Sequence, residues 1–549
     1  MGITIGQVIA ALAFTISIQQ FLKPIHRFRL QAWGVPLLWL YVGVFSGAAL
    51  VFSGNLLRYI AVEWSVILWL APALEFAGAL LFFMAYLATG FISLSPARLR
   101  SRNVLSFTRA AFAILSTADE ENYVALFNDI SANTATLAKT AAFADSYRWS
   151  GVGSGEPSAF YDFVHRKKLA DASYASTLFE LLSDPSCCAT MVRRNPTTVV
   201  SMLSELSDKQ IVCDAAGLLV QELARQAVLR EDSMLAREVG YKGFSSVGLF
   251  LNSMFGDVFI LRTYKPFSNL TYLGDVTITP GVAERLGEAI ETAWEKTNEL
   301  WHPQSLWQTA SVLKSAFFSI RYSDSRKARH ELEHFRLYTS VARILKATEK
   351  RVSENKYEPK SLYAKDDKVS HDDTMPGLAA RIAINALNSV SNDFEGPEDR
   401  RWSDVLTIMR ELFPSIGEAP DGLSPTQQHA MLMIDEKLAD NMDGYYPALT
   451  RVLLSVIGPH GSRDQKNQTA FRILEDVAYA RWKKFPALHN KKPEKVEDKL
   501  PPNVTFDSTR SVLEYTYRSG ETVETNLSTL AVPSIDLFDP SLRRRQVKM

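Results

Sequence analysis

Residues 66–92 read VILWLAPALEFAGALLFFMAYLATGFI, and this apolar stretch decides how the rest of the chain is arranged. A helix of this length spans about 40 Å at 1.5 Å per residue, more than the roughly 30 Å hydrocarbon core of a bilayer. The stretch contains Pro72 and Glu75, so we expect it to tilt or to begin at the interface. The pattern predicts a transmembrane helix in which Glu75 is protonated, paired, or near the headgroups.

Two further apolar stretches precede it. Residues 3–22 carry no charge and are long enough to cross a bilayer, and they lack the basic start of a cleaved signal peptide. Residues 35–52 form a second uncharged stretch with aromatic side chains near its start. We therefore expect residues 1–95 to form three transmembrane helices, over about 3–22, 35–52 and 66–92.

Basic side chains indicate the orientation of these helices. They gather in the first loop and after the third span, as Lys23, Arg27 and Arg29, and as Arg98, Arg100 and Arg102. The second loop holds Arg58. The positive-inside rule places the N-terminus outside and the C-terminal region in the cytosol, and we expect a bacterial inner membrane. Arg98, Arg100 and Arg102 are then expected to lie at the membrane surface, against lipid headgroups.

A glycine motif lies in the second span. Gly43 and Gly47 are one helical turn apart and form a GxxxG pattern. Two small residues at this spacing let another helix approach closely, which favours helix association in a membrane. We expect self-association into a homo-oligomer through this face. The alternative is that glycine is simply common in membrane helices.

The rest of the chain has the composition of an ordinary globular protein. The 549 residues contain 60 Lys and Arg against 60 Asp and Glu, so the net charge is zero and no nucleic acid is indicated as a partner. Three cysteines cannot form a disulfide framework, and we interpret them as buried small side chains.

Helical periodicity dominates after residue 95, so the predicted fold is three membrane helices followed by a mostly helical cytosolic region with minor β structure. Short strands are expected near 255–280 and a terminal hairpin near 505–528. Charged and proline-containing stretches suggest the domain boundaries. The predicted segments are a helical domain at 96–350, a linker at 351–376, a second helical segment at 377–490, a linker at 491–503, and the hairpin with a basic tail at 504–549.

One motif could carry catalysis. The sequence His330-Glu331-Leu332-Glu333-His334 matches H-E-x-x-H, in which two histidines on one helix face bind Zn²⁺ and the first glutamate polarises a bound water. The charged Glu333 departs from the usual pattern, and the basic residues just before the motif disfavour a bound cation. A third ligand is also required, and its candidates lie in or beside the 351–376 linker: Glu354, Asp367 and His371.

Three functional hypotheses follow. The first is a membrane-tethered cytosolic interaction or regulatory protein that self-associates through its spans and binds a protein partner on the cytosolic side; it needs no cofactor. The second is a membrane-anchored zinc peptidase that uses His330, His334 and Glu331. The third is a pore-forming membrane effector. The sequence contains no P-loop, nucleophile elbow or C-x-x-C motif that would support another enzyme class.

Overall fold

The protein was analysed as a computed structural model, which divides into two compact units, residues 1–235 and 236–549. The boundary lies inside the segment 96–350. The structure describes residues 6, 23–33, 37–60, 65–100, 103–116, 120–150, 159–240, 248–273, 276–300, 302–322, 330–355, 373–389, 402–412, 424–433 without 428 and 431–432, 504–516 without 508 and 511, and 522–526.

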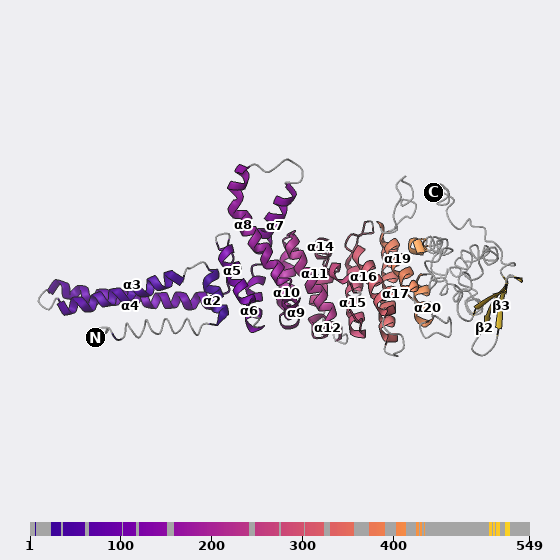
Figure 1. The fold of residues 1–549 in the computed structure, drawn as a ribbon, viewed down its shortest axis with the longest axis horizontal. Helices are drawn as coiled ribbons and strands as arrows, with labels where there is room; N and C mark the ends of the chain where they lie inside the picture. The colour runs from indigo at the N-terminus through magenta and orange to yellow at the C-terminus, as the bar shows by residue number, and fades with distance from the viewer. Residues whose placement is uncertain are drawn as a thin grey trace. The chain divides into compact units, whose positions relative to one another are not determined.

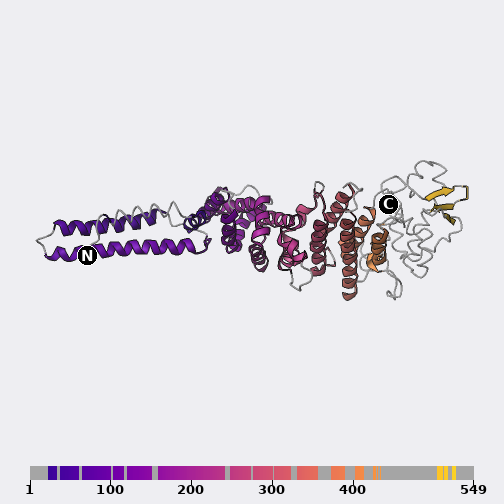
Figure 2. The same ribbon diagram turned by 90° about the horizontal axis from the view of Figure 1, so that it is seen from below.

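Unit 1 begins with a long helical hairpin. Helices α3 (Leu37–Ile60) and α4 (Ser65–Leu94) lie side by side in both views (Figures 1 and 2). Their contacts run in opposite directions along the two helices, because Gly43 faces Ala85 whereas Gly54 faces Ala71. The helices are therefore antiparallel.

Glycines allow the two backbones of the hairpin to touch. A Cβ added to Gly47 would lie 2.9 Å from the carbonyl oxygen of Gly78, and one added to Gly78 would lie 2.6 Å from that of Gly47. A Cβ on Gly43 would lie 3.6 Å from the Cβ of Ala85. The GxxxG face thus packs against α4 of the same chain. Self-association through Gly43 and Gly47 stays a prediction.

Among the residues that the structure describes, one helical segment, Leu70–Leu94 of α4, is long and apolar enough to cross a membrane. Much of its surface is exposed, including the aromatic rings of Phe76, Phe83 and Phe91. The expected first span at 3–22 lies outside the described residues except for Gly6. The part of α3 whose side chains are described, which includes Asn55 and Arg58, does not meet the same criterion. The expectation of three spans is therefore not confirmed.

The remainder of unit 1 is a packed set of helices. Asp184 and Pro185 mark one helix boundary, because the Asp184 side chain accepts the Ser186 N–H at 2.9 Å and caps α9. The core includes the fully buried Phe107, Phe127 and Phe179. The helices are α2 (Pro24–Ala32), α5 (Val104–Leu115), α6 (Glu120–Ser131), α7 (Thr134–Ser150), α8 (Ala159–Leu182), α9 (Pro185–Arg194), α10 (Pro196–Asp208), α11 (Asp214–Leu229) and, across the unit boundary, α12 (Met234–Gly240).

Unit 2 is also mainly helical. Thr279 caps α15 by accepting the Val282 N–H at 3.3 Å, and Pro280 occupies the first helical position. The apolar stripe of α15 that ends at Trp294 is buried against neighbouring helices. The longer helices are α15 (Pro280–Lys296), α16 (Trp307–Tyr322), α17 (His330–Glu354), α19 (Met375–Asn388) and α20 (Trp402–Leu412).

The strands expected near 255–280 are not formed by the residues described there. A π-helical turn (Asn252–Gly256) leads into α14 (Val258–Thr263). The Asp257 side chain accepts the Ile260 N–H at 3.0 Å, which caps α14. Ile260 and Leu261 are buried in this helical form. Capping and tertiary burial therefore override the strand propensity of the β-branched and aromatic side chains.

Strands occur near the C-terminus. The described residues form β1 (Val504–Asp507), β2 (Val512–Thr516) and β3 (Thr522–Asn526) in one antiparallel sheet with the order β1-β2-β3. Strands β2 and β3 make up the hairpin expected near 505–528, with Thr516 opposite Thr522. Strand β1 pairs with β2 as a third strand, which the predicted two-stranded hairpin did not include.

Candidate functional site

The connection after α4 is held by hydrogen bonds from several side chains of unit 1. Pro96 follows the end of α4; it lacks an N–H, and it disfavours helical backbone in the residue before it. The segment 95–100 therefore runs without helix, with Ala97 and Leu99 buried and Arg98 and Arg100 exposed. The alternation fixes which side chains face the protein.

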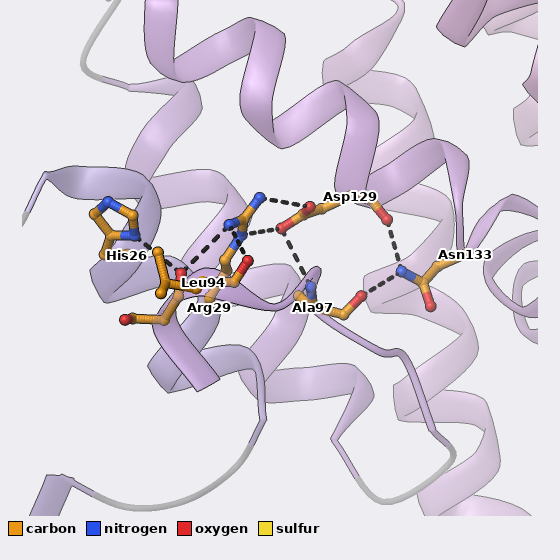
Figure 3. A network of polar contacts seen from close by, with 7 residues as sticks. His26, Arg29, Leu94, Ala97, Asp129 and Asn133 are labelled. Carbon is orange, nitrogen blue, oxygen red and sulfur yellow. Dashed lines mark hydrogen bonds and ion pairs between the residues drawn. The ribbon is translucent and has the colours of Figure 1, made fainter. Parts of the chain in front are cut away.

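A buried ion pair joins α2 to α6 beside this segment. The Arg29 guanidinium donates from Nε to Asp129 Oδ2 at 2.9 Å and from Nη2 to Oδ1 at 3.1 Å (Figure 3). The Asp129 side chain is 1% exposed and that of Arg29 is 16% exposed. Two parallel hydrogen bonds between charged groups fix orientation as well as distance. The pair sets the position of α2 against α6.

The same arginine caps the C-terminus of α4. Its Nη1 donates to the carbonyl oxygens of Ser93 at 3.3 Å and Leu94 at 3.2 Å. The His26 ring nitrogen Nδ1 lies 2.9 Å from the Ser93 oxygen. The last carbonyls of a helix have no partner within the helix and carry partial negative charge, so a cation there is favourable. Helix α4 is thereby attached to α2.

The backbone of segment 95–100 is held by α6 and by the residues that follow it. Asp129 Oδ2 accepts the Ala97 N–H at 3.2 Å, and Asn133 accepts the Leu99 N–H at 2.7 Å while donating to the Ala97 oxygen at 2.7 Å. The Asn103 amide donates to the Ala32 oxygen at 2.5 Å, at the end of α2. These bonds form a joint, defined here as Arg29, Asp129, Asn133, Asn103 and segment 95–100.

The described residues also give Glu75 a partner. Its Oε2 lies 3.0 Å from Arg58 Nη2 across the hairpin, and its side chain is 6% exposed. The absence of a side chain at Gly54 makes room for Glu75, because a Cβ at position 54 would lie 2.8 Å from Glu75 Cγ. Arg58 is 37% exposed. Of the three alternatives that the sequence left open for Glu75, the structure shows an ion pair.

The predicted surface arginines are placed in part. Arg98 and Arg100 are exposed at the joint, next to the end of α4. Arg102 lies outside the described residues. The two arginines that are described project from a backbone held on its other side by Asp129 and Asn133.

The H-E-x-x-H motif occupies the first turn of α17, which begins at His330. The side chains of His330, Glu331 and His334 lie outside the described part of the chain. The candidate ligand Glu354 is near Lys350 and Arg351, with N–O distances of 3.9 and 3.8 Å. Within the described ranges, no group of three His, Cys, Asp or Glu residues is placed to hold a metal ion. The zinc site stays a prediction.

The cysteines are buried small side chains, as expected. Cys187 and Cys188 lie on α9 and Cys213 precedes α11, and all three are free thiols. Burial raises the pKa of Cys187 and of Cys213 to about 11, and it raises the pKa of Cys188 well above its usual range. The thiolate is the reactive form, so these side chains serve packing.

Sequence reasoning missed the joint. It treated Arg29 as one topological charge among several and did not single out Asp129, Asn133 or Asn103. One signal was present, since Asp129 interrupts the apolar face of the segment that forms α6. A buried carboxylate needs a partner, but its partner stands 100 positions away and the spacing gives no indication of it.

Comparisons with protein-family models, with curated proteins and with solved structures found no match to this chain.

Proposed function

We propose that this chain is a membrane-tethered protein whose helical region acts in the cytosol as an interaction or regulatory module. The observation that carries the proposal is the joint. An apolar helix long enough to span a bilayer ends at Leu94, and its last carbonyls are bonded directly to Arg29, which is paired with Asp129. This arrangement favours a fixed attachment of unit 1 helices at the membrane over a flexible tether.

The distribution of basic side chains supports a cytosolic location. Lys23 and Arg27 on or beside α2 are exposed at the same end of the hairpin as Arg98 and Arg100. Arg58 lies at the opposite end and is paired with Glu75. The positive-inside rule then favours a multi-pass chain with the N-terminus outside and the helices that follow residue 95 in the cytosol, and we place it in a bacterial inner membrane.

Membrane attachment and orientation are tested together. In membranes that contain the full-length chain, we expect it to stay in the pellet after an alkaline carbonate wash, because the apolar surface of α4 is stable only in lipid. Protease should remove a C-terminal tag in inside-out vesicles and spare it in right-side-out vesicles. Release by carbonate would contradict the attachment, and the reverse protection pattern would contradict the orientation.

A protein partner is tested by photo-crosslinking from unit 2. Tyr272 is 87% exposed, and its backbone is fixed because the neighbouring carbonyls of Thr271 and Leu273 accept hydrogen bonds from Ser315 and Ser319 of α16. A photoreactive benzoylphenylalanine in place of Tyr272 should give a discrete adduct with another protein in illuminated cells, because an exposed aromatic side chain on a fixed backbone suits a protein interface.

The matched control is Tyr59 in α3, which is 84% exposed and lies at the end of the hairpin away from the joint. The same photoreactive residue at this position should give no adduct with the cytosolic partner. If the two positions gave the same adducts, or if neither gave any, the result would contradict a protein partner bound at Tyr272.

A further inference from the structure

Arg98 and Arg100 form an exposed pair on a segment whose backbone is held by hydrogen bonds. They stand two positions apart in the non-helical segment 95–100 and are both exposed, whereas Ala97 and Leu99 between and beside them are buried. Residues two apart in extended backbone point to the same side and are about 6–7 Å apart. Two guanidinium groups can therefore approach one anionic group from a common face.

The backbone under this pair is held before any ligand arrives. The N–H of Ala97 is bonded to Asp129 and that of Leu99 to Asn133. Asn103 accepts the N–H of Arg100 at 2.6 Å and donates to the oxygen of Arg98 at 2.9 Å. A preorganised site loses less conformational entropy on binding than a flexible one. The joint thus presents the two arginines as a ready-made site.

The pair lies where the hydrocarbon would end. Leu94, the last residue of the apolar span, is 73% exposed and stands four positions before Arg98. Arg29 is neutralised by Asp129, but Lys23 is exposed beside α2. Among the residues that the structure describes, neither Arg98 nor Arg100 forms an ion pair. The exposed side chains of Lys23, Arg98 and Arg100 therefore give this end of the hairpin a positive surface.

We propose that Arg98 and Arg100 bind the headgroup phosphate of an anionic phospholipid in the cytosolic leaflet. The inference rests on the proposed membrane attachment and names a specific lipid class for it. Arginine matches phosphate oxygens through paired N–H donors, and each basic residue near an anionic leaflet contributes about 1 kcal/mol. A zwitterionic lipid carries the same phosphate beside a cationic group, so the pair distinguishes the two by charge.

The experiment measures which lipid the full-length chain retains. Protein purified in detergent is mixed with equal amounts of phosphatidylglycerol and phosphatidylcholine, and the bound lipids are counted by native mass spectrometry. The wild-type chain should retain mainly phosphatidylglycerol. In the double variant R98Q/R100Q the ratio of the two bound lipids should fall about tenfold or more, because two charges at the site are lost. Excess inorganic phosphate should not displace the lipid, which separates a headgroup site from a site for free phosphate.

Two further variants distinguish the site from net charge. The variant K167Q/K168Q removes two exposed positive charges from α8 and should leave the ratio unchanged. The variant N133A keeps every charge but frees the Leu99 N–H, and it should lower the ratio if the fixed backbone positions the pair. Deuterium uptake by segment 95–100 reports whether N133A has loosened it.

The results that would overturn the lipid site differ from the result that would contradict the membrane attachment. A chain that stays in the carbonate pellet but shows the same lipid ratio in R98Q/R100Q and in wild type would overturn the lipid site alone. An equal fall in R98Q/R100Q and in K167Q/K168Q would overturn it as well, because the effect would then follow total charge. Displacement by inorganic phosphate would also count against it. Release of the chain by carbonate would instead contradict the membrane attachment.

Discussion

Replacing Arg29 with methionine should destabilise the joint by about 3–5 kcal/mol, the usual effect of removing one partner from a buried ion pair. The variant leaves the Asp129 carboxylate, 1% exposed, without its cation, and it also removes the donors to the Ser93 and Leu94 carbonyls at the end of α4. The change is local in a large helical chain, so amide hydrogen exchange is the suitable measurement. Exchange in residues 97–133 should accelerate on the order of 100-fold or more.

The control for this prediction is R109M, which removes an exposed arginine from α5. Exchange should then stay close to wild type. The double variant R29M/D129L should recover much of the lost protection, because replacing both partners with apolar side chains removes the unpaired charge. Part of the loss should remain, since the Ala97 N–H also depends on Asp129. Unchanged exchange in R29M would show that the ion pair does not hold the joint together.

Replacing Gly78 with leucine should separate the two helices of the hairpin. A Cβ at this position would lie 2.6 Å from the Gly47 oxygen and 3.0 Å from the Val51 nitrogen, and these backbone atoms cannot move without displacing α3. Overpacking in a close contact costs about 1–3 kcal/mol, and more where backbone must shift. The effect should therefore be loss of the α3–α4 contact over several turns.

An engineered disulfide measures this separation. The Cβ of a cysteine at Gly43 would lie 3.6 Å from the Cβ of residue 85, within the range that a disulfide bridges. The variant G43C/A85C should therefore cross-link within one chain on mild oxidation in membranes. Adding G78L should reduce the yield to background. The native cysteines add little background, because they are buried and their thiol pKa values are raised.

The matched control is G90L, which adds the same side chain to α4 at a position where a Cβ meets nothing within 4 Å. It should leave the cross-link intact. The experiment also tests self-association, since a cross-linked dimer in place of the intramolecular product would place Gly43 against a second chain. That result would contradict the packing described here and would favour the homo-oligomer predicted from the GxxxG motif.

Local signals in the sequence determined the elements of this protein. The cap of α15 at Thr279 and Pro280 lies where the residue types place it, and the Ser424 and Gln427 side chains each bond the backbone N–H of the other, as a capping box requires. The apolar stretch of α4 and the mainly helical character were likewise readable from composition and periodicity. These features depend on neighbours within a few positions, so one sequence suffices to predict them.

Tertiary structure decided the partners. Gly43 and Gly47 meet α4 of the same chain, Glu75 meets Arg58, and the residues predicted as a strand near 258 form a capped helix that buries Ile260. The joint is the extreme case, because Arg29 and Asp129 are 100 positions apart. A sequence pattern shows that a side chain will be buried, or that a buried carboxylate needs a cation. It does not show which of many suitable cations becomes the partner. That pairing is set when distant helices pack, because burial and hydrogen-bond geometry depend on the packing.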